Sequence, residues 1–178
     1  MTTTQLNLQG LQKVLTGKGS RGVAFNCMIK FYSNNCTLCT EVKEAYLQVA
    51  KKHSSPTTAF FVHNIHEGFM AKRAAKKNDL SSSHAILNVN VVEDVLKKLN
   101  SLNPEYKKMF NMPVRYGVTP LFLKVETGLL PGVSHISLFL ESDCFDPEHP
   151  DRYIRNPTAQ DFQDFFQDKN SKKVLTIK

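Results

Sequence analysis

The sequence predicts an α/β fold, in which a central mixed sheet carries helices on both of its faces. Two patterns along the chain lead to this prediction. Apolar runs at 23–33 and 57–65 flank a segment of helical periodicity, which is the pattern of a strand–helix–strand unit. Apolar runs at 118–128 and 133–142 lie on either side of a glycine turn and precede an amphipathic helix. A strand–helix–strand unit joined to a hairpin gives a sheet with both parallel and antiparallel pairs.

Size and composition set broad limits on the protein. Its 178 residues, of which 41% are hydrophobic and 22% charged, are ordinary for a globular protein, so we expect a single domain spanning 1–178. No stretch approaches the roughly 18 apolar residues that a membrane span needs. The N-terminal sequence lacks the basic and apolar regions of a secretory signal, so we expect an intracellular, reducing compartment. The net charge of +7 favours contact with acidic surfaces.

The first half of the chain contains the elements expected at the centre of the sheet. Residues 5–16 predict a short helix, and the glycine-rich 17–22 predicts a loop. The run at 23–33 is rich in aromatic and β-branched side chains and predicts a buried strand. The helix after it has one apolar face, made of Leu38, Val42, Ala45, Tyr46 and Val49. A Ser-Ser-Pro sequence ends this helix, and 57–65 predicts a second strand.

The segment 69–111 has a different character. It holds eight Lys and Arg residues against four acids, a net charge of +4, and most of it predicts helices. Within it, 79–90 predicts a loop or a short strand. We therefore expect 69–111 to be a basic, mostly helical insertion in the domain.

The chain is expected to close with an amphipathic helix over 158–170. Thr158 is a good N-cap, and Asp161 lies in the first turn, where the helix dipole favours an acid. The apolar stripe of this helix consists of Phe162, Phe165 and Phe166. We expect the stripe to pack against the sheet.

Four cysteines are present, and two of them form a Cys-x-x-Cys motif at a strand-to-helix junction. Cys36 lies at the helix N-terminus, where free backbone N–H groups and the helix dipole favour an anion and lower the pKa of a thiol from about 8.5. Cys39 lies one turn later and could attack a mixed disulfide formed at Cys36. We expect Cys27 to be a small core residue and Cys144 to be a surface thiol in a polar loop.

The residues alone leave three roles open for this motif: a redox-capable pair, an inherited motif with little activity, or half of a metal site. The sequence has no second Cys-x-x-Cys that could complete a metal site. His63 and His66 are three residues apart on a predicted strand, so they would face opposite sides of it. We therefore expect no metal.

Two stretches carry a resemblance to a known family. "IKFYSNNCTLC" (29–39) is a buried strand that runs into Cys-x-x-Cys, and "YGVTPLFLKV" (116–125) is a loop whose Thr-Pro opens a strand. With the C-terminal "RYIRNPTAQDFQDFF", which is similar to a last strand and closing helix, most of the chain outside 69–111 resembles the thioredoxin fold family. The resemblance implies a three-layer α/β/α fold with a central mixed sheet, in which 69–111 is inserted before the cis-proline strand.

The same resemblance implies roles for individual residues. Cys36 would be the nucleophile and Cys39 the resolving thiol. Pro120 would be a cis-proline that shapes the groove for a substrate strand, and Thr119 would offer its backbone to that strand. Further substrate contacts are expected from the residues that border the cysteines, namely Asn35, Thr37 and Leu38.

Some positions depart from the family pattern. Asn35 stands where an aromatic residue usually precedes the first cysteine, and Thr37-Leu38 matches neither Gly-Pro nor Gly-His between the cysteines. Lys30 occupies the strand position at which the family often has a buried acid that helps to move the proton of the second cysteine. A lysine there would favour a thiolate by its charge or would point to solvent, so Lys30 is a candidate for tuning the pKa of the pair.

Two hypotheses for function follow. The first is a thiol–disulfide oxidoreductase that acts on protein disulfides through Cys36 and Cys39, without a bound cofactor. The alternative is a redox-inactive or weakly active interaction protein of the same fold, for example a component of a large assembly such as a virus particle. Its contact with an acidic protein surface would come from a basic run, Lys72, Arg73, Lys76 and Lys77. Nucleic acid ranks third, because neither interleaved aromatic residues nor a nucleic-acid motif accompanies the run.

Overall fold

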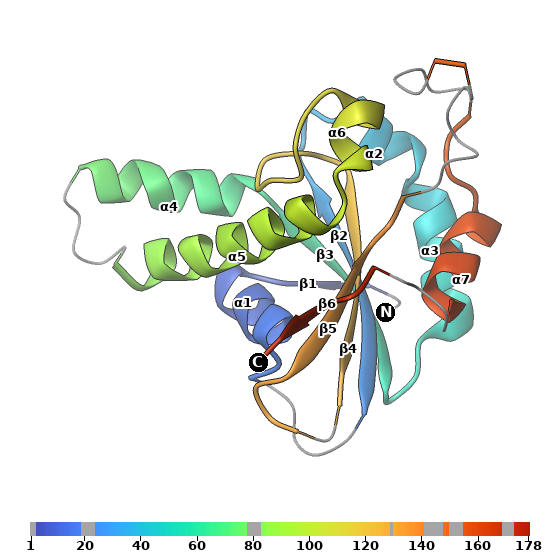
Figure 1. Cartoon of the computed structure of the whole chain (residues 1–178), viewed down its shortest axis with the longest axis horizontal. Helices are drawn as coiled ribbons and strands as arrows, with labels where there is room; N and C mark the ends of the chain where they lie inside the picture. The colour runs from blue at the N-terminus through green and yellow to red at the C-terminus, as the bar shows by residue number, and fades with distance from the viewer. Residues whose placement is uncertain are drawn as a thin grey trace.

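The computed structural model of the protein contains a twisted sheet between two layers of helices (Figure 1). It describes residues 3–18, 24–77, 83–128, 130–140, 148–149, 155–168 and 173–178. The strands are β1 (Thr4–Gln5), β2 (Phe25–Tyr32), β3 (Thr58–Asn64), β4 (Leu121–Thr127), β5 (Ser134–Leu138) and β6 (Leu175–Ile177). The helices are α1 (Leu8–Thr16), α2 (Thr37–Glu41), α3 (Lys43–His53), α4 (His66–Lys76), α5 (Ser83–Leu102), α6 (Glu105–Phe110) and α7 (Ala159–Gln167).

The described strands form one open sheet of six strands in the order β1-β3-β2-β4-β5-β6. β3 pairs in parallel with both β1 and β2, whereas β2–β4, β4–β5 and β5–β6 are antiparallel pairs. The parallel pair β2–β3 is joined through the helices after the cysteines, and the antiparallel pair β4–β5 is a hairpin. The α/β class with a mixed sheet and covered faces, predicted from the sequence, is therefore confirmed.

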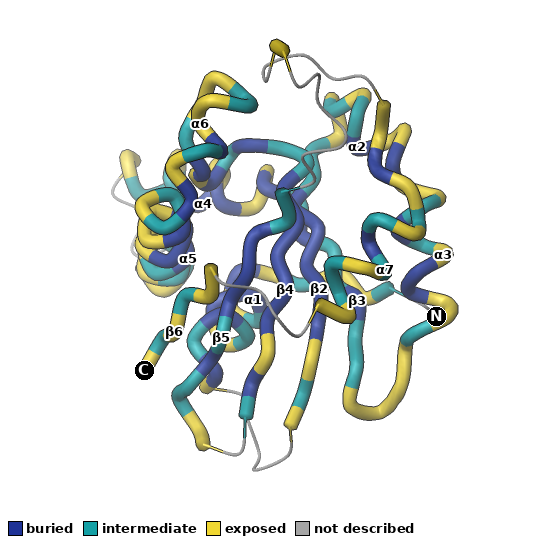
Figure 2. Tube along the Cα trace, turned by 45° about the vertical axis from the view of Figure 1, so that its right-hand side comes forward, coloured by how far each residue is buried: buried dark blue, intermediate teal, exposed yellow. Residues whose placement is uncertain are grey.

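Strand β2 shows how the sheet separates two cores. Its side chains alternate in direction, so Cys27, Ile29 and Phe31 enter the core under α1 and α5, whereas Met28 enters the core under α3 and α7. All four are fully buried. Figure 2 shows that much of the central strands β2 and β4 is buried. Cys27 is a free cysteine in this core, as predicted, and burial raises the pKa of its thiol far above the usual range.

The core under α3 and α7 is aromatic. Tyr46 of α3 lies at its centre, with ring centroids of Phe60, Phe122 and Phe162 within 5.8–6.0 Å of its own. The predicted N-cap of α7 is present: the side chain of Thr158 accepts from the amide of Asp161, and the Asp161 carboxylate accepts in return from the amide of Thr158. Of the predicted stripe, Phe162 is fully buried, and Phe165 and Phe166 pack at the edge of this core.

Most of the described residues of the segment 69–111 are helical, but one part of the segment was predicted wrongly. Residues 83–90, within the range assigned to a loop or short strand, form the first two turns of α5, which is 20 residues long. Val89, Val92, Leu96 and Leu99 are spaced at intervals of three and four and are buried against α1 and the sheet. The valines lower the helix propensity of the segment, but burial of this apolar face outweighs that preference. α4 lies antiparallel beside α5, and the pair extends away from the sheet (Figure 1).

Three other points of the sequence analysis need correction. β1 and β6 were missed, because strands of two and three residues give too short a pattern to detect. His66 does not belong to the strand of His63: β3 ends at Asn64, and His66 is the first residue of α4. Residues 155–157, part of the stretch assigned to a last strand, are not in a strand; residues 151–154 and Cys144 lie outside the described residues.

Candidate functional site

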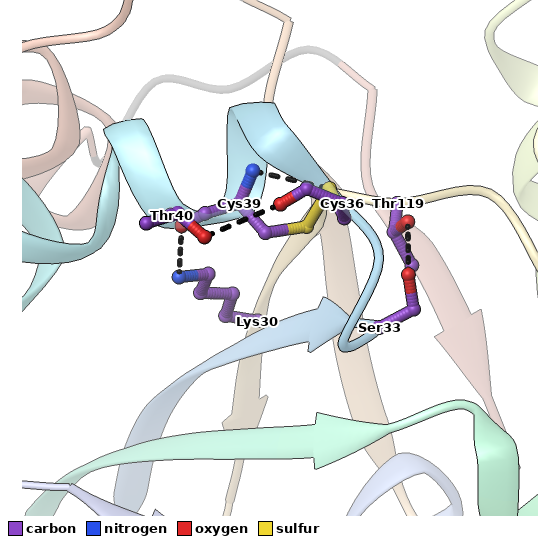
Figure 3. Close-up of a disulfide and its surroundings, with 6 residues drawn as sticks. All are labelled: Lys30, Ser33, Cys36, Cys39, Thr40 and Thr119. Carbon is purple, nitrogen blue, oxygen red and sulfur yellow. Dashed lines mark hydrogen bonds between the residues drawn. A yellow bond between two sulfur atoms is a disulfide. The ribbon is translucent and has the colours of Figure 1, made fainter.

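The pairing of β2 with β4 determines where the cysteines lie relative to the Thr-Pro sequence. In this antiparallel pair Phe31 is opposite Leu121. Continuing the register by two residues places Ser33, which follows β2, opposite Thr119, which precedes β4. Their hydroxyl oxygens lie 3.4 Å apart (Figure 3). The loop that leads into Cys36 therefore lies beside Thr119 and Pro120 because of strand register.

Cys36 and Cys39 are joined by a disulfide bond. Cys36 is the N-cap of α2, with an extended backbone, and its Sγ accepts a hydrogen bond of 3.0 Å from the amide of Cys39 (Figure 3). α2 is followed directly by α3, and both share Val42 as a boundary residue. The spacing of three residues thus brings the two sulfur atoms together across the first turn of a helix.

The two cysteines differ in their exposure. Cys36 is half-buried, whereas Cys39 is only 4% exposed. An incoming thiol or disulfide therefore has access to the sulfur of Cys36 rather than to that of Cys39. In chemical terms the first sulfur is placed for attack by or on an external group, and the second for exchange within the protein.

Lys30 is buried beneath the motif. It is 5% exposed and points to the α3 side of the sheet, as its neighbour Met28 does. Its ammonium group donates a hydrogen bond of 2.9 Å to the backbone carbonyl oxygen of Cys39 (Figure 3). The same group lies 6.0 Å from the ring centre of Tyr46. Burial, with a smaller effect from the charge of Lys43, lowers the pKa of Lys30 to about 8. Lys30 therefore does not point to solvent.

A cleft of about 400 Å³ opens on the Cys39 side of the motif. Its lining includes Lys30, Thr40, Lys43 and Tyr32 together with Cys39. Cys39 is buried at the edge of this cleft. The space is large enough for water molecules, and its two lysines make the surroundings of Cys39 positive.

On the other side of the motif lies the Thr119–Pro120 peptide bond, which is cis. The cis isomer agrees with the expectation from the thioredoxin fold family. Both residues are half-buried. The peptide thus forms part of the surface beside Cys36.

The loop that precedes this peptide is held from beneath by Tyr116. Its hydroxyl accepts a hydrogen bond of 3.1 Å from the amide of Gly68 and lies 2.8 Å from Nε2 of His63. Nδ1 of His63 lies 2.9 Å from the carbonyl oxygen of Leu6, which only accepts, so Nδ1 carries a proton and Nε2 of the neutral ring is an acceptor. Burial lowers the pKa of His63 and thereby favours this neutral ring.

The remaining candidates lie around these groups. Asn35 and Thr37 are exposed next to Cys36, and Leu38 is half-buried against the aromatic core under α3. The basic run lies on α4, away from the cysteines in sequence: Lys72 forms an ion pair with Glu93 of α5, and Arg73, Lys76 and Lys77 are exposed.

Sequence reasoning missed Ser33, Lys43 and Tyr116, whose roles depend on strand register and on packing between distant segments.

Metal-binding clusters and membrane-spanning helices are both absent from the described part of the chain. There, no cluster of three or more His, Cys, Asp and Glu side chains has the arrangement of a metal site. Nor does any described helix combine the length and the apolar composition needed to cross a bilayer.

The sequence matches no protein-family model, and a search of curated proteins finds no relative. The fold and the site define an α/β protein with an open mixed sheet and a Cys-x-x-Cys disulfide at a strand-to-helix junction. This arrangement is loosely similar to that of thioredoxin.

Proposed function

We propose that the protein is a thiol–disulfide oxidoreductase of the thioredoxin-like group that acts on protein disulfides through Cys36 and Cys39. The observation that carries this proposal is the disulfide between a half-buried Cys36 and a buried Cys39, next to the Thr119–Pro120 peptide. A sulfur that clients can reach, followed by a second one that they cannot, is the arrangement needed for a two-step exchange. The reaction requires no bound cofactor.

In the reducing direction, the Cys36 thiolate attacks one sulfur of a client disulfide. The client S–S bond breaks, a Cys36–client mixed disulfide forms, and the second client sulfur leaves as a thiolate and takes up a proton. Cys39 then loses its proton and attacks Sγ of Cys36, which forms the Cys36–Cys39 disulfide and releases the first client sulfur as a thiol. Two electrons pass from the pair to the client. Two further electrons, from a dithiol or from glutathione, reduce the pair again. The oxidising direction is the reverse.

We propose that Lys30 tunes this reaction. Its charge lies beneath Cys39, and that charge favours the thiolate form that must attack the mixed disulfide. Proton exchange with solvent would take place through the cleft that Lys30 and Cys39 share. Thr119 and Pro120 would receive the client strand, with Asn35, Thr37 and Leu38 at its border.

Trapping of the mixed disulfide tests the proposal. A Cys39→Ser variant, incubated with a peptide that carries a disulfide, should accumulate a mixed disulfide at Cys36 that mass spectrometry detects. Cys36→Ser is the matched control and should accumulate little, because Cys39 is buried. Equal trapping by both variants, or trapping by neither, would contradict the proposed roles.

A second candidate is an interaction protein in a larger assembly, which uses the fold without redox turnover. One observation favours it: α4 and α5 expose large apolar side chains, Phe69, Met70 and Leu87, beside the basic run of α4. In that case the double variant Cys36→Ser/Cys39→Ser would retain function. Charge reversal at Lys72, Arg73, Lys76 and Lys77 would instead abolish binding of the partner.

A further inference from the structure

A groove of about 650 Å³ lies where α4, α5 and the loop 113–117 meet. α4 contributes Phe69 and Lys72, and α5 contributes Glu93 and Lys97. The loop contributes all of its residues from Pro113 to Gly117. The groove is thus formed by the segment 69–111 and by the residues that lead directly into Thr119 and Pro120.

The charges of this groove are unbalanced. Lys72 and Glu93 neutralise each other in an ion pair. Lys97 and Arg115 are exposed, and neither has an ion-pair partner among the residues that the structure describes. Two cations therefore face the groove without a local counter-charge, and the exposed Arg73 and Lys76 on α4 add to the positive field nearby.

The groove also has an apolar element. Phe69 is 44% exposed, and its ring contacts Tyr116 edge to face, with the centroids 5.9 Å apart. The Phe69 ring also covers Gly117, where an added Cβ would lie 3.1 Å from the ring. An exposed aromatic ring in the same groove as two cations suits a polypeptide segment that combines carboxylates with an apolar side chain.

The lining of the groove is held in place before any partner arrives. The amide of Val114 donates a hydrogen bond of 2.9 Å to the side-chain oxygen of Asn100 on α5. The Tyr116 hydroxyl accepts a hydrogen bond of 3.1 Å from the amide of Gly68, in the first turn of α4. A partner would therefore lose little binding free energy in ordering the site.

The groove is close to the redox pair. Gly117 is two residues from Thr119, so its Cα lies within about 7 Å of that of Thr119. The hydroxyl of Thr119 in turn lies 3.4 Å from that of Ser33, which is three residues before Cys36. A polypeptide held beside Cys36 and Thr119 therefore reaches the groove after about two to four further residues in extended conformation.

We propose that this groove binds an extended acidic segment of the protein client whose disulfide is exchanged at Cys36, which makes acidic polypeptides the preferred substrate class. The inference rests on the proposed oxidoreductase function. The alternative partner of a basic groove is nucleic acid, but two unpaired cations are few for a backbone contact, which commonly engages about 6–10 phosphates.

Matched peptides test the proposal. One carries a run of glutamates and a leucine starting about two residues from its cysteine, and the other has glutamines in place of the glutamates. Fluorescence anisotropy with Cys36→Ser/Cys39→Ser protein measures binding without exchange. We expect the acidic peptide to bind about tenfold more tightly, a difference of about 1.4 kcal/mol. In Lys97→Glu/Arg115→Glu this preference should vanish, whereas the control Lys13→Glu/Lys51→Glu, with the same charge change on α1 and α3, should retain it.

The outcomes separate the two proposals. Equal binding of both peptides, or a preference for the acidic peptide that survives in Lys97→Glu/Arg115→Glu, contradicts the proposed role of the groove. Tighter binding of an oligonucleotide than of the acidic peptide, lost in the same variant, also overturns it and assigns the surface to nucleic acid. If the anisotropy results hold but wild-type protein exchanges disulfides with neither peptide, the groove stands as an acidic-peptide site and the oxidoreductase function fails.

Discussion

The ammonium group of Lys30 donates a hydrogen bond of 2.9 Å to the carbonyl oxygen of Cys39, in a position only 5% exposed to solvent. A lysine is thus kept in the protein interior next to the less accessible cysteine of the disulfide. Burial lowers the pKa of Lys30 to about 8 because it disfavours the charged ammonium form. The hydrogen bond to Cys39 favours that charged form. Such an arrangement reduces stability and calls for a functional reason.

Replacement of Lys30 by methionine should stabilise the oxidised protein. A lysine that titrates near 8 when folded and at 10.5 when unfolded binds fewer protons in the native state between these values, so its contribution to stability rises with pH across that range. At pH 7 this shift corresponds to roughly 3 kcal/mol, from which loss of the hydrogen bond subtracts about 1 kcal/mol. We expect Lys30→Met to raise the free energy of unfolding by about 1–2 kcal/mol at pH 7.

Urea titrations at several pH values check this prediction. The advantage of Lys30→Met should shrink as the pH approaches 10.5, the ordinary value for lysine. Lys51→Met, at an exposed position in the last turn of α3, is the control and should change stability little. A destabilised Lys30→Met at neutral pH would mean that the hydrogen bond outweighs the buried charge.

The same substitution should slow the redox reaction. Without the positive charge beneath Cys39, a smaller fraction of this thiol is ionised, and closure of the disulfide from a mixed disulfide at Cys36 becomes slower. We expect a loss of about tenfold in the rate of closure at neutral pH, which corresponds to about 1.4 kcal/mol in the barrier. Stopped-flow measurement of client release, with wild type and Lys51→Met as references, checks it. An unchanged rate would show that Lys30 has no part in the chemistry.

His63 should make stability depend on pH in the mildly acidic range. Its pKa is lowered in the folded protein, chiefly by burial, so the unfolded chain binds a proton at a higher pH than the native protein does. The contribution of His63 is fully present above about 6.5 and is lost as the pH falls below it, by at most about 1.4 kcal/mol per pH unit. In His63→Gln the unfolding free energy should vary less between pH 7 and about 5. His66→Gln, at an exposed position, should keep the wild-type slope; a wild-type slope in His63→Gln would exclude this origin.

Gly68 should not tolerate a larger residue, although it lies in a helix. A Cβ at this position would come within 2.4 Å of the Tyr116 ring and hydroxyl, the group that holds the loop before Thr119. Helix propensity alone would favour alanine by about 1 kcal/mol. We nevertheless expect Gly68→Ala to lower the free energy of unfolding by about 1–3 kcal/mol and to weaken peptide exchange. At Gly128 an added Cβ meets nothing within 4 Å, so Gly128→Ala should be close to neutral in the same denaturation assay.

Much of the fold could be predicted from the sequence because its main patterns are local. The apolar run of β2, the helix face around Tyr46 and the cap at Thr158 each depend on spacing within a few residues. α5 was partly misread, because its valines and asparagines lower helix propensity and only burial against α1 makes the helix stable. The two terminal strands were missed because two and three residues are too few to show an alternating pattern.

The site was predictable to the extent that its chemistry lies in a motif. The spacing of Cys36 and Cys39 indicated a pair of cysteines, and the resemblance to a known family indicated a cis-proline at Pro120. The contacts of Tyr116 with His63 and Gly68, and of His63 with Leu6, could not be foreseen, because three separate segments meet there only after the sheet has formed. The groove next to Thr119 depends likewise on how α4 and α5 pack against the loop 113–117.

Equilibrium redox titration of the Cys36–Cys39 pair tests the central claim most directly. Purified protein is equilibrated in a series of reduced and oxidised glutathione mixtures, and the fraction of disulfide is measured by alkylation and mass spectrometry. The account predicts a single reversible two-electron transition within the range that glutathione poises, with Cys36 and Cys39 oxidised together and Cys27 remaining a thiol. A pair that stays reduced, or stays oxidised, across the whole series would contradict a role in disulfide exchange.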